Sequence, residues 1–337
     1  MATILLIASM NFIVDPFGAF GDGFFKMYGY NMNKNVRIAK ISYLDKYYKN
    51  FDSYIIGGSK SGSLLPETLN KYYPGSSFYN LNIYGGRFLD YEKTIHYIVK
   101  NYKVKNIVFQ ISQLEADKQG TLGGNTNMLH GKLTSDFPII FYMRMLAINP
   151  TYSMEKLKAV KKWTPEYADI FLFNAKNGAY NRDSMEKQIN SNSEKYFSNK
   201  ALFPDSMPYI KNPVYDYNLT VLKRIVSFCR DNGVNLLVIT SPTYITELET
   251  YPADKFRDYL TSIVGITDYW NFSGYNTVNM DITNFYDKTH FREKVGNMML
   301  ARIFGDDSVE IPKDFGILVT SENCAACIDA AVKDGNG

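Results

Sequence analysis

The stretch Tyr54-Ile55-Ile56-Gly57-Gly58-Ser59-Lys60 decides the fold, because an apolar strand in it ends in two glycines and a serine. The pattern predicts a hydroxyl group at the carboxyl end of a buried strand. Gly57 and Gly58 allow a sharp turn, and the N–H groups that follow can face a developing negative charge. An ordinary strand-to-helix turn has the same pattern, so this stretch by itself leaves both interpretations open.

Residues 57–63 also look like a phosphate-binding loop, because they read Gly-Gly-Ser-Lys-Ser-Gly-Ser. Such a loop needs a glycine, any four residues, and then Gly-Lys-Ser or Gly-Lys-Thr. Here Ser59 precedes Lys60, and Tyr54 stands where the first glycine belongs. The spacing therefore excludes a P-loop.

The composition of the 337 residues is that of a globular protein. Hydrophobic residues make up 45% and aromatic residues 15%, with 27 tyrosines, which excludes a disordered chain. The net charge of +3 is too small to indicate nucleic-acid binding. Abundant tyrosines accompany carbohydrate-binding surfaces, but half-buried packing tyrosines are the commoner case.

The three cysteines indicate neither a disulfide framework nor a four-ligand metal site. Cys229 stands alone, whereas Cys324 and Cys327 have the Cys-x-x-Cys spacing of a redox or zinc motif without a second pair. They lie in a C-terminal tail rich in small residues. We therefore expect no metal and interpret the spacing as incidental.

A pattern of alternating strands and helices surrounds the glycine-serine turn. Strands are predicted at residues 54–56, 77–83, 105–111, 235–240 and 269–272. Helical periodicity separates them, so the strands are expected to be parallel. Five such strands predict an α/β fold with a doubly wound, flavodoxin-like sheet, in which ligands bind at the carboxyl ends of the strands.

Residues 115–211 interrupt this alternation. They contain two helical patterns and a polar half, 174–200, and we expect an inserted, largely helical cap over the site. The sequence does not decide whether the polar half is a mobile lid or a solvated loop. The α/β domain is then expected to cover residues 40–306, with residues 307–337 as a C-terminal tail.

The N-terminal segment TILLIASMNFIV, residues 3–14, is apolar and carries no charge. It is shorter than the roughly 18 residues that would span a bilayer. It also lacks the basic start of a signal peptide. Our hypothesis is that residues 1–20 are the remnant of a membrane anchor, and the alternative is a buried strand or helix.

A serine is a poor nucleophile unless a base takes its proton, and the chain has three histidines. His96 lies between core positions of a predicted helix, and His130 lies in a Gly/Asn-rich loop, so structural and solvated roles are favoured for them. His290 follows Asp287 by three residues and precedes an apolar helix. That spacing lets the carboxylate orient the imidazole, although a polar cluster at a helix N-terminus has the same pattern.

Taken together, Gly57-Gly58-Ser59 and Asp287-Lys288-Thr289-His290 resemble the SGNH (GDSL-like) hydrolase and acyltransferase superfamily. Its first block places the nucleophile in a Gly-Asp-Ser-like turn, and its last block is Asp-x-x-His. The chain is most similar to the branch that includes the D-alanyl transfer protein of teichoic acid synthesis and the alginate O-acetylation proteins. The resemblance covers residues 40–117 and 215–304.

This resemblance implies a catalytic triad without a metal or an organic cofactor. Ser59 would be the nucleophile, His290 the general base and acid, and Asp287 the carboxylate that orients the imidazole. Ser61 and Ser63 lie further into the turn, where a capping role is the default.

The resemblance leaves the oxyanion hole incomplete. The usual aspartate of the first block is Gly58 here, and the third-block Gly-x-Asn-Asp is absent after Ile111. The N–H groups of Ser59 and of Gly86, which we prefer to Gly85, match the family's backbone donors. Losing one donor typically costs about 10²–10³ in rate. The side-chain donor is left open among three residues: Gln110, Gln113 and Asn82.

The function implied by the resemblance is that of a serine-dependent esterase or O-acyltransferase. Its substrate would be a cell-surface polysaccharide or a small acyl ester, its candidate partner a multi-spanning membrane acyltransferase, and nucleic acid is not expected. The implied location is extracytoplasmic and membrane-anchored, with a cytoplasmic location left open. The alternative is a non-catalytic accessory or carbohydrate-binding protein that keeps the fold.

The insertion bears on whether an acyl group goes to water or to a sugar. If residues 115–211 cover Ser59, they exclude water and hold a glycan, which favours transfer. Several tyrosines there offer flat faces for sugar rings, or pack the insertion against the sheet: Tyr142, Tyr152, Tyr167, Tyr180 and Tyr196. We favour transfer.

Overall fold

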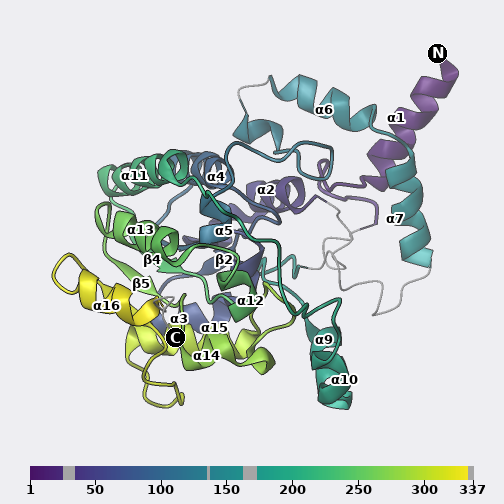
Figure 1. The fold of residues 1–337 in the computed structure, drawn as a ribbon. Coiled ribbons are helices and arrows are strands. Elements are labelled where there is room, and N and C mark those ends of the chain that lie inside the picture. Colours follow the sequence, from purple (N-terminus) through teal and green to yellow (C-terminus); the bar gives the residue numbers. More distant parts are fainter. Residues whose placement is uncertain (26–34, 135–136, 162–172, 333–337) are drawn as a thin grey trace.

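The computed structural model describes residues 1–25, 35–134, 137–161 and 173–332 (Figure 1). A six-stranded sheet forms its centre, with the strand order β2-β1-β3-β4-β5-β6. The first five strands pair in parallel, and β6 pairs antiparallel with β5. The fold is therefore α/β with a mostly parallel, mixed sheet, as its class was predicted, but the sheet has six strands where five were expected.

The strands are short and lie where the sequence places them. Their bounds are β1 (Ser53–Ile56), β2 (Phe78–Asn80), β3 (Asn106–Ile111), β4 (Asn235–Thr240), β5 (Tyr269–Asn271) and β6 (Ile317–Val319). Every residue of β1 and β3 is buried, as expected for parallel strands covered on both faces. The register places Ile55 beside Asn80 on one side and Val108 on the other.

Helices fill the rest of the chain. They are α1 (Ala2–Val14), α2 (Val36–Tyr47), α3 (Pro66–Tyr72), α4 (Phe88–Asn101), α5 (Gln113–Ala116), α6 (Pro138–Leu146), α7 (Thr151–Lys161), α9 (Asp183–Ser191), α10 (Ser193–Phe197), α11 (Asp216–Asp231), α12 (Ile245–Leu248), α13 (Ala253–Val264), α14 (Thr277–Met280), α15 (Glu293–Phe304) and α16 (Cys324–Ala331).

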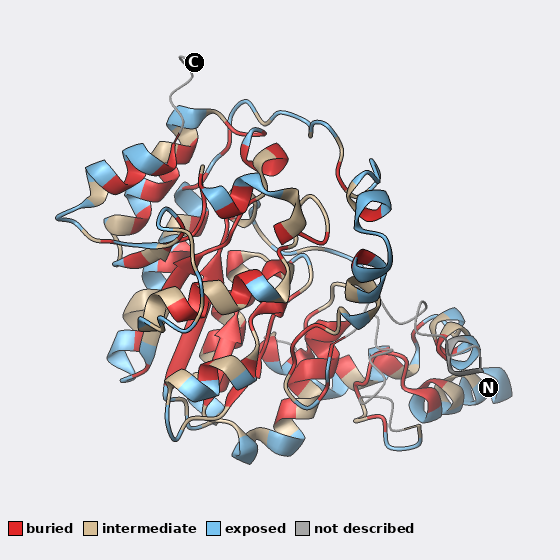
Figure 2. Cartoon of the chain, turned by 90° about the horizontal axis from the view of Figure 1, so that it is seen from below, coloured by how far each residue is buried: buried red, intermediate tan, exposed pale blue. Residues whose placement is uncertain are grey.

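Alternate side chains of the strands point to two separate hydrophobic cores. On one face Ile56 and Phe109 pack with residues of α4, α11 and α13. On the other face Ile55 and Val108 pack with residues of α3, α14 and α15. Figure 2 shows the buried residues concentrated on the strands and on the inner faces of these helices. The two cores fix the strand ends, and with them the loops that carry polar side chains.

Residues 307–337, treated as a tail in the sequence analysis, join the fold as far as they are described. Their strand β6 closes one edge of the sheet beside β5. Their helix α16 packs against α13 and places Cys327 and Ile328 in the main core. Cys327 and Cys324 are free thiols in this structure. This segment is therefore continuous with the α/β domain.

The described part of the insertion contains the helices α6, α7, α9 and α10 with irregular segments between them, and helices were predicted for its first half. Helices α6 and α7 pack against α1, and together these three lie apart from the sheet (Figure 1). The predicted end of the second helix, near Trp163, lies outside the described residues. The N-terminal apolar segment is itself helical, as α1. Among the helices that the structure describes, none combines the length and the apolar character that crossing a bilayer requires.

Candidate active site

The nucleophile turn follows β1 directly and depends on two glycines. A Cβ atom at Gly57 would lie 2.6 Å from the carbonyl oxygen of Gln110, and one at Gly58 would lie 1.8 Å from Glu115 Oε1. Ser59 then begins a 3₁₀ helix over residues 59–63. Its first backbone bond runs from Ser61 N–H to the carbonyl of Gly58 (3.1 Å). The N–H of Ser59 lies at the first turn of this helix, before the first residue whose N–H is bonded within it. It can therefore donate a hydrogen bond to a ligand.

The Asp-x-x-His motif lies on a tight loop before α15. The N–H of Tyr286 donates to the carbonyl of His290 (2.7 Å), and Phe285 forms an antiparallel bridge with Phe291. These three aromatic residues are fully buried in the core under the loop. Hydrophobic burial on both sides of the motif therefore holds the imidazole in place.

Ser59, His290 and Asp287 are brought into contact. The distance from Ser59 Oγ to His290 Nε2 is 2.8 Å, and His290 Nδ1 lies 2.9 Å from each carboxylate oxygen of Asp287. Ser59 is half-buried, and the side chains of His290 and Asp287 are about one fifth exposed. The group is thus arranged as a nucleophile, a base and an orienting carboxylate, and a ligand can reach it.

The other two histidines lie elsewhere. His96 on α4 stacks on Phe228, with 3.9 Å between ring centroids. His130 is 1% exposed, and its Nδ1 accepts a hydrogen bond from Lys132 N–H (3.1 Å). Burial lowers the pKa of His130 to about 4. Neither imidazole is in contact with Ser59 in the described residues. A structural role was expected for His96, but the solvated position expected for His130 is wrong, because its ring is buried against Phe141.

The carboxylate of Asp287 is held in its charged form. Burial raises its pKa, but His290 and the N–H and hydroxyl of Thr289 outweigh burial, so that the net shift is well below the usual range. Asp287 Oδ1 also accepts the N–H groups of Thr289 (2.8 Å) and His290 (3.0 Å). The carboxylate is therefore fixed in position and able to stabilise an imidazolium.

A buried charged group lies directly beneath the turn. Lys60 Nζ contacts Glu247 Oε1 at 2.5 Å, and both side chains are less than 5% exposed. Glu115 faces this pair. Burial raises the pKa of Glu115 to about 7, with Lys60 opposing and Glu247 adding to the shift. Lys60 is paired with Glu247, so burial outweighs the attraction of the ammonium for Glu115.

The backbone donors expected at the oxyanion hole are only partly available. The N–H of Gly86 donates to the carbonyl of Ile83 (3.0 Å), so the preferred glycine is engaged in a turn. The N–H of Gly85 has no hydrogen-bond partner within the part of the chain that the structure describes. Gly85 therefore fits the role better than Gly86.

The three proposed side-chain donors differ in their partners. Gln113 Nε2 donates to the Tyr215 hydroxyl at 2.6 Å and is thereby engaged. Gln110 is 2% exposed, and neither end of its amide has a partner among the described residues. Asn82 accepts the Lys40 ammonium at Oδ1, whereas its buried Nδ2 has no partner in the same residues.

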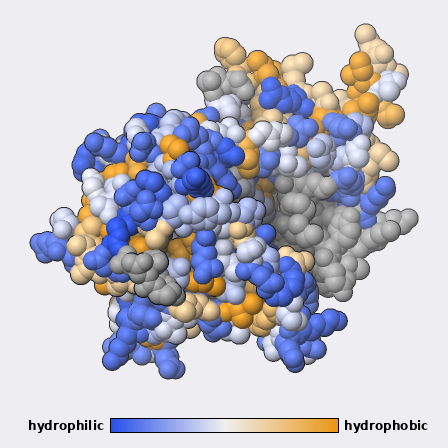
Figure 3. All heavy atoms as spheres, viewed as in Figure 1, coloured by the Kyte–Doolittle hydropathy of each residue, from blue (hydrophilic) through white to orange (hydrophobic). Residues whose placement is uncertain are grey.

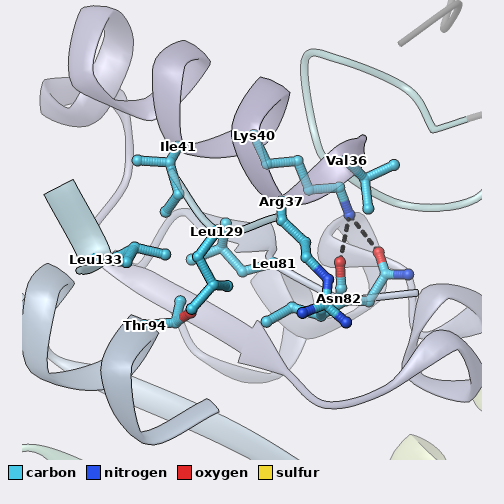
Figure 4. Close-up of a pocket in the computed structure, with 10 residues that line it drawn as sticks. Val36, Arg37, Lys40, Ile41, Leu81, Asn82, Thr94, Leu129 and Leu133 are labelled. Carbon is cyan, nitrogen blue, oxygen red and sulfur yellow. Dashed lines mark hydrogen bonds between the residues drawn. The ribbon is translucent and has the colours of Figure 1, made fainter. Parts of the chain in front are cut away.

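Figure 4 shows how Lys40 reaches Asn82 beside a small cavity of about 10 Å³. The ammonium also donates to the carbonyl oxygens of Asn80 (3.2 Å), Asn82 (3.1 Å) and Gly178 (2.8 Å). The cavity has room for about one water molecule, too little for a substrate. Lys40 therefore serves to bind the end of β2 to the insertion.

Tyr180, from the insertion, lies against the nucleophile turn. Its N–H donates to the carbonyl of Gly62 (2.9 Å), and its ring leaves no room for a Cβ there. Its ring centroid is 6.4 Å from that of His290, and Arg182 covers the ring at 4.2 Å. Burial raises the pKa of Tyr180, while Arg182 and a hydrogen bond with Ser59 oppose this shift. The sequence analysis left open whether Tyr180 offers a face to sugar rings or packs the insertion against the sheet, and here its ring packs against the turn.

The second half of the insertion docks on the histidine loop. Glu186 of α9 accepts hydrogen bonds from Arg292 Nε (2.9 Å) and from the Tyr286 hydroxyl (2.8 Å). The Tyr196 hydroxyl donates to the carbonyl of Tyr286 (2.8 Å). The segment 174–200 is thus attached beside the site by α9 and α10.

The remaining insertion tyrosines are more distant. Tyr142 and Tyr152 pack against Phe20 and Phe17, next to α1. Tyr167 lies outside the described residues. Of the four tyrosines that the structure describes, Tyr180 and Tyr196 are therefore the two near the histidine loop.

In chemical terms the arrangement is suited to covalent catalysis by a serine. Within the described ranges, no cluster of three or more His, Cys, Asp or Glu side chains is placed to bind a metal ion. Comparison with protein-family models and with curated proteins finds no match for this chain.

Proposed function

We propose that the chain is a serine-dependent esterase or O-acyltransferase that acts on acyl esters of a cell-surface polysaccharide. The observation that carries the proposal is the contact of Ser59 Oγ with His290 Nε2 at 2.8 Å, with Asp287 bound to the opposite nitrogen. Such a chain of hydrogen bonds raises the nucleophilicity of a serine that is inert by itself.

The proposed reaction has two steps. Ser59 Oγ attacks the acyl carbonyl while His290 takes its proton, and His290 then gives that proton to the departing alcohol, leaving an acyl-enzyme. In the second step His290 deprotonates water or a sugar hydroxyl, which attacks the acyl carbonyl. The bond from the acyl carbon to Ser59 Oγ then breaks, and His290 returns the proton to Oγ. Asp287 keeps the imidazole in the required tautomer throughout.

The developing negative charge on the carbonyl oxygen needs hydrogen-bond donors. We assign this role to the N–H groups of Ser59 and Gly85 and to the hydroxyl of Tyr180. Tyr180 is our candidate for the place of the absent third-block asparagine, because its ring packs against Gly62 in the nucleophile turn and its centroid is 6.4 Å from that of His290. Gln110 and Asn82, which are buried below, are the alternatives.

The sheet supports the same family assignment. The order of the parallel strands, β2-β1-β3-β4-β5, is that of flavodoxin-like doubly wound sheets, in which ligands bind beyond the carboxyl ends of the strands. Ser59 follows β1 at that edge. We therefore interpret the chain as an SGNH-like domain to which the antiparallel β6 has been added.

Covalent labelling separates this enzyme from a binding protein that keeps only the fold. A fluorophosphonate should modify Ser59, and the variants Ser59→Ala and His290→Ala should not react. Circular dichroism would show that each variant is folded. An unreactive serine in the folded wild-type chain would favour the accessory or carbohydrate-binding alternative.

We further propose transfer in preference to hydrolysis, because Tyr180 and the helices α9 and α10 enclose one side of the site. A small acyl ester would be supplied with and without oligosaccharide acceptors, and the acyl group followed by mass spectrometry. Acylated oligosaccharide is expected. Free acid as the sole product with every acceptor would identify a hydrolase.

For location and partners, the resemblance supports an extracytoplasmic protein on the membrane that receives acyl groups from a multi-spanning membrane acyltransferase. Fractionation of cells that express the gene from its genomic start tests the location. A gene for such an acyltransferase beside this one would support the partner.

A further inference from the structure

The exposed half of α1 is apolar on all sides. Ile4, Leu5 and Leu6 are 72%, 63% and 72% exposed, and successive residues of a helix point about 100° apart. No charged residue occurs between Ala2 and Val14. A helix that is hydrophobic all round is normally buried in a core or in lipid, and this half is in no core.

A second run of exposed apolar residues begins α6. Phe137, Ile139 and Ile140 are 75%, 65% and 47% exposed, and Met143, one turn later, is 62% exposed. The other side of α6 is buried through Phe141 and Met145. In Figure 3 hydrophobic side chains mark the same upper border of the molecule where Figure 1 places α1 and α6.

Buried polar contacts fix these two helices in one arrangement. Asn11 Nδ2 donates to the carbonyls of Leu146 (2.9 Å) and Ile148 (2.8 Å), and Asn11 Oδ1 accepts from Ser153 (2.7 Å). Lys156 of α7 donates to the carbonyl of Asp15 (2.7 Å). These contacts fix how α1 is placed against the end of α6 and against α7. The exposed apolar residues of the two helices are together called the apolar edge here: Ile4, Leu5, Leu6, Phe137, Ile139, Ile140 and Met143.

We propose that the apolar edge enters the outer part of a lipid bilayer. A protein groove would cover one side of α1 and leave its other apolar sides in water, whereas lipid surrounds the helix completely. The exposed turns of α1 then lie among the acyl chains, where a helix that is apolar on all sides is stable. Helix α6 then lies in the interface with its apolar side toward the acyl chains.

This contact is independent of the proposed chemistry at Ser59. It goes beyond a tether through the N-terminus, because α6 belongs to the insertion and would set how the protein is oriented on the membrane. The attraction is apolar, so it should resist salt and should not require anionic lipid.

Flotation of the full chain with vesicles tests the proposal. We expect binding both to phosphatidylcholine vesicles and to vesicles that also contain phosphatidylglycerol, in low and in high salt. The double variant Ile139→Glu/Met143→Glu should lower the partition coefficient about tenfold or more. Leu5→Glu/Leu6→Glu should do the same from the other helix. All four positions are exposed, so the variants should unfold at the wild-type temperature.

The matched control is Met280→Glu. Met280 is 59% exposed on α14, away from the apolar edge, and this variant should bind vesicles like wild type. Absence of wild-type binding, or equal loss in Met280→Glu, would overturn the proposal. The proposal would also be overturned if the chain did not bind vesicles but self-associated through these residues in size-exclusion chromatography. Labelling of Ser59 is measured on the same samples, so failure here is distinct from failure of the proposed chemistry.

Discussion

The carboxylate of Glu115 occupies the space that a side chain at Gly58 would need, since a Cβ atom there would lie 1.8 Å from Glu115 Oε1. Gly58 stands where the superfamily that the sequence resembles has an aspartate, and Glu115 follows the strand after which that superfamily has its Gly-x-Asn-Asp. The two departures from the superfamily's motifs, a glycine at position 58 and a glutamate at position 115, are therefore adjacent in the structure. An acid is supplied from α5 where none comes from the turn.

Introducing the family's aspartate alone should therefore harm the protein. Gly58→Asp places a second carboxyl group against Glu115, and overpacking of this kind costs about 1–3 kcal/mol. We expect a lower free energy of unfolding in urea and weaker fluorophosphonate labelling of Ser59.

The double variant Gly58→Asp/Glu115→Ala should recover part of both losses, because it removes the clash. A double-mutant cycle measures this coupling. If the two substitutions changed the free energy of unfolding additively, the side chains at positions 58 and 115 would not compete for the same space.

Asp287→Asn should abolish most activity while leaving Ser59 in place. The amide cannot accept from His290 Nδ1 and stabilise an imidazolium in the same way, and loss of this role in a triad costs about 10⁴ in kcat. The measurement is ester hydrolysis under saturating substrate. A loss below tenfold would mean that Asp287 only caps the loop.

Tyr180→Phe tests the proposed oxyanion donor, because it removes the hydroxyl and keeps the ring. We expect kcat to fall about 10²–10³ with little change in KM. The matched control is Tyr196→Phe, which loses a hydrogen bond to Tyr286 and should cost about 1 kcal/mol of stability without a comparable loss of kcat. Equal kcat in Tyr180→Phe and wild type would return the role to Gln110 or Asn82.

Glu115 should make stability depend on pH in a definite direction. Its pKa is raised from 4.5 to about 7, so between these values the folded chain binds a proton that the unfolded chain has lost. The contribution of Glu115 to stability therefore falls as pH rises through this window. Glu115→Gln should remove that slope, on the order of 1–3 kcal/mol between pH 4.5 and 7. Urea unfolding of both proteins at several pH values measures it, and parallel curves would contradict the shift.

The fold was predictable where local pattern and burial agree. Strands β1 to β5 are apolar runs bounded by glycine, asparagine or polar turns, and each was placed within a few residues. Strand β6 was not predicted, because Ile317, Leu318 and Val319 form a run of three apolar residues without alternation. Only pairing with β5 makes that run a strand.

The site divides in the same way. Asp287 and His290 are three residues apart, so the spacing allowed their contact. It became an expectation only together with the Gly-Gly-Ser turn. The role expected for Ser59 was inferred from the two glycines that precede it. The structure shows why the turn needs them, because Gln110 and Glu115 leave no room for a side chain at Gly57 or Gly58.

Other features depend on segments that are distant in sequence and meet only when the sheet is formed. The sequence by itself determined the α/β alternation, the serine after the first strand and the Asp-x-x-His before the last long helix, since each is a local property of the chain. Tertiary structure decided that Tyr180 lies against the turn that carries Ser59, that the Gly86 N–H is engaged by the carbonyl of Ile83, and that Glu115 fills the space at Gly58. These contacts follow from how two hydrophobic cores position separate loops at one edge of the sheet, and no local pattern encodes that geometry.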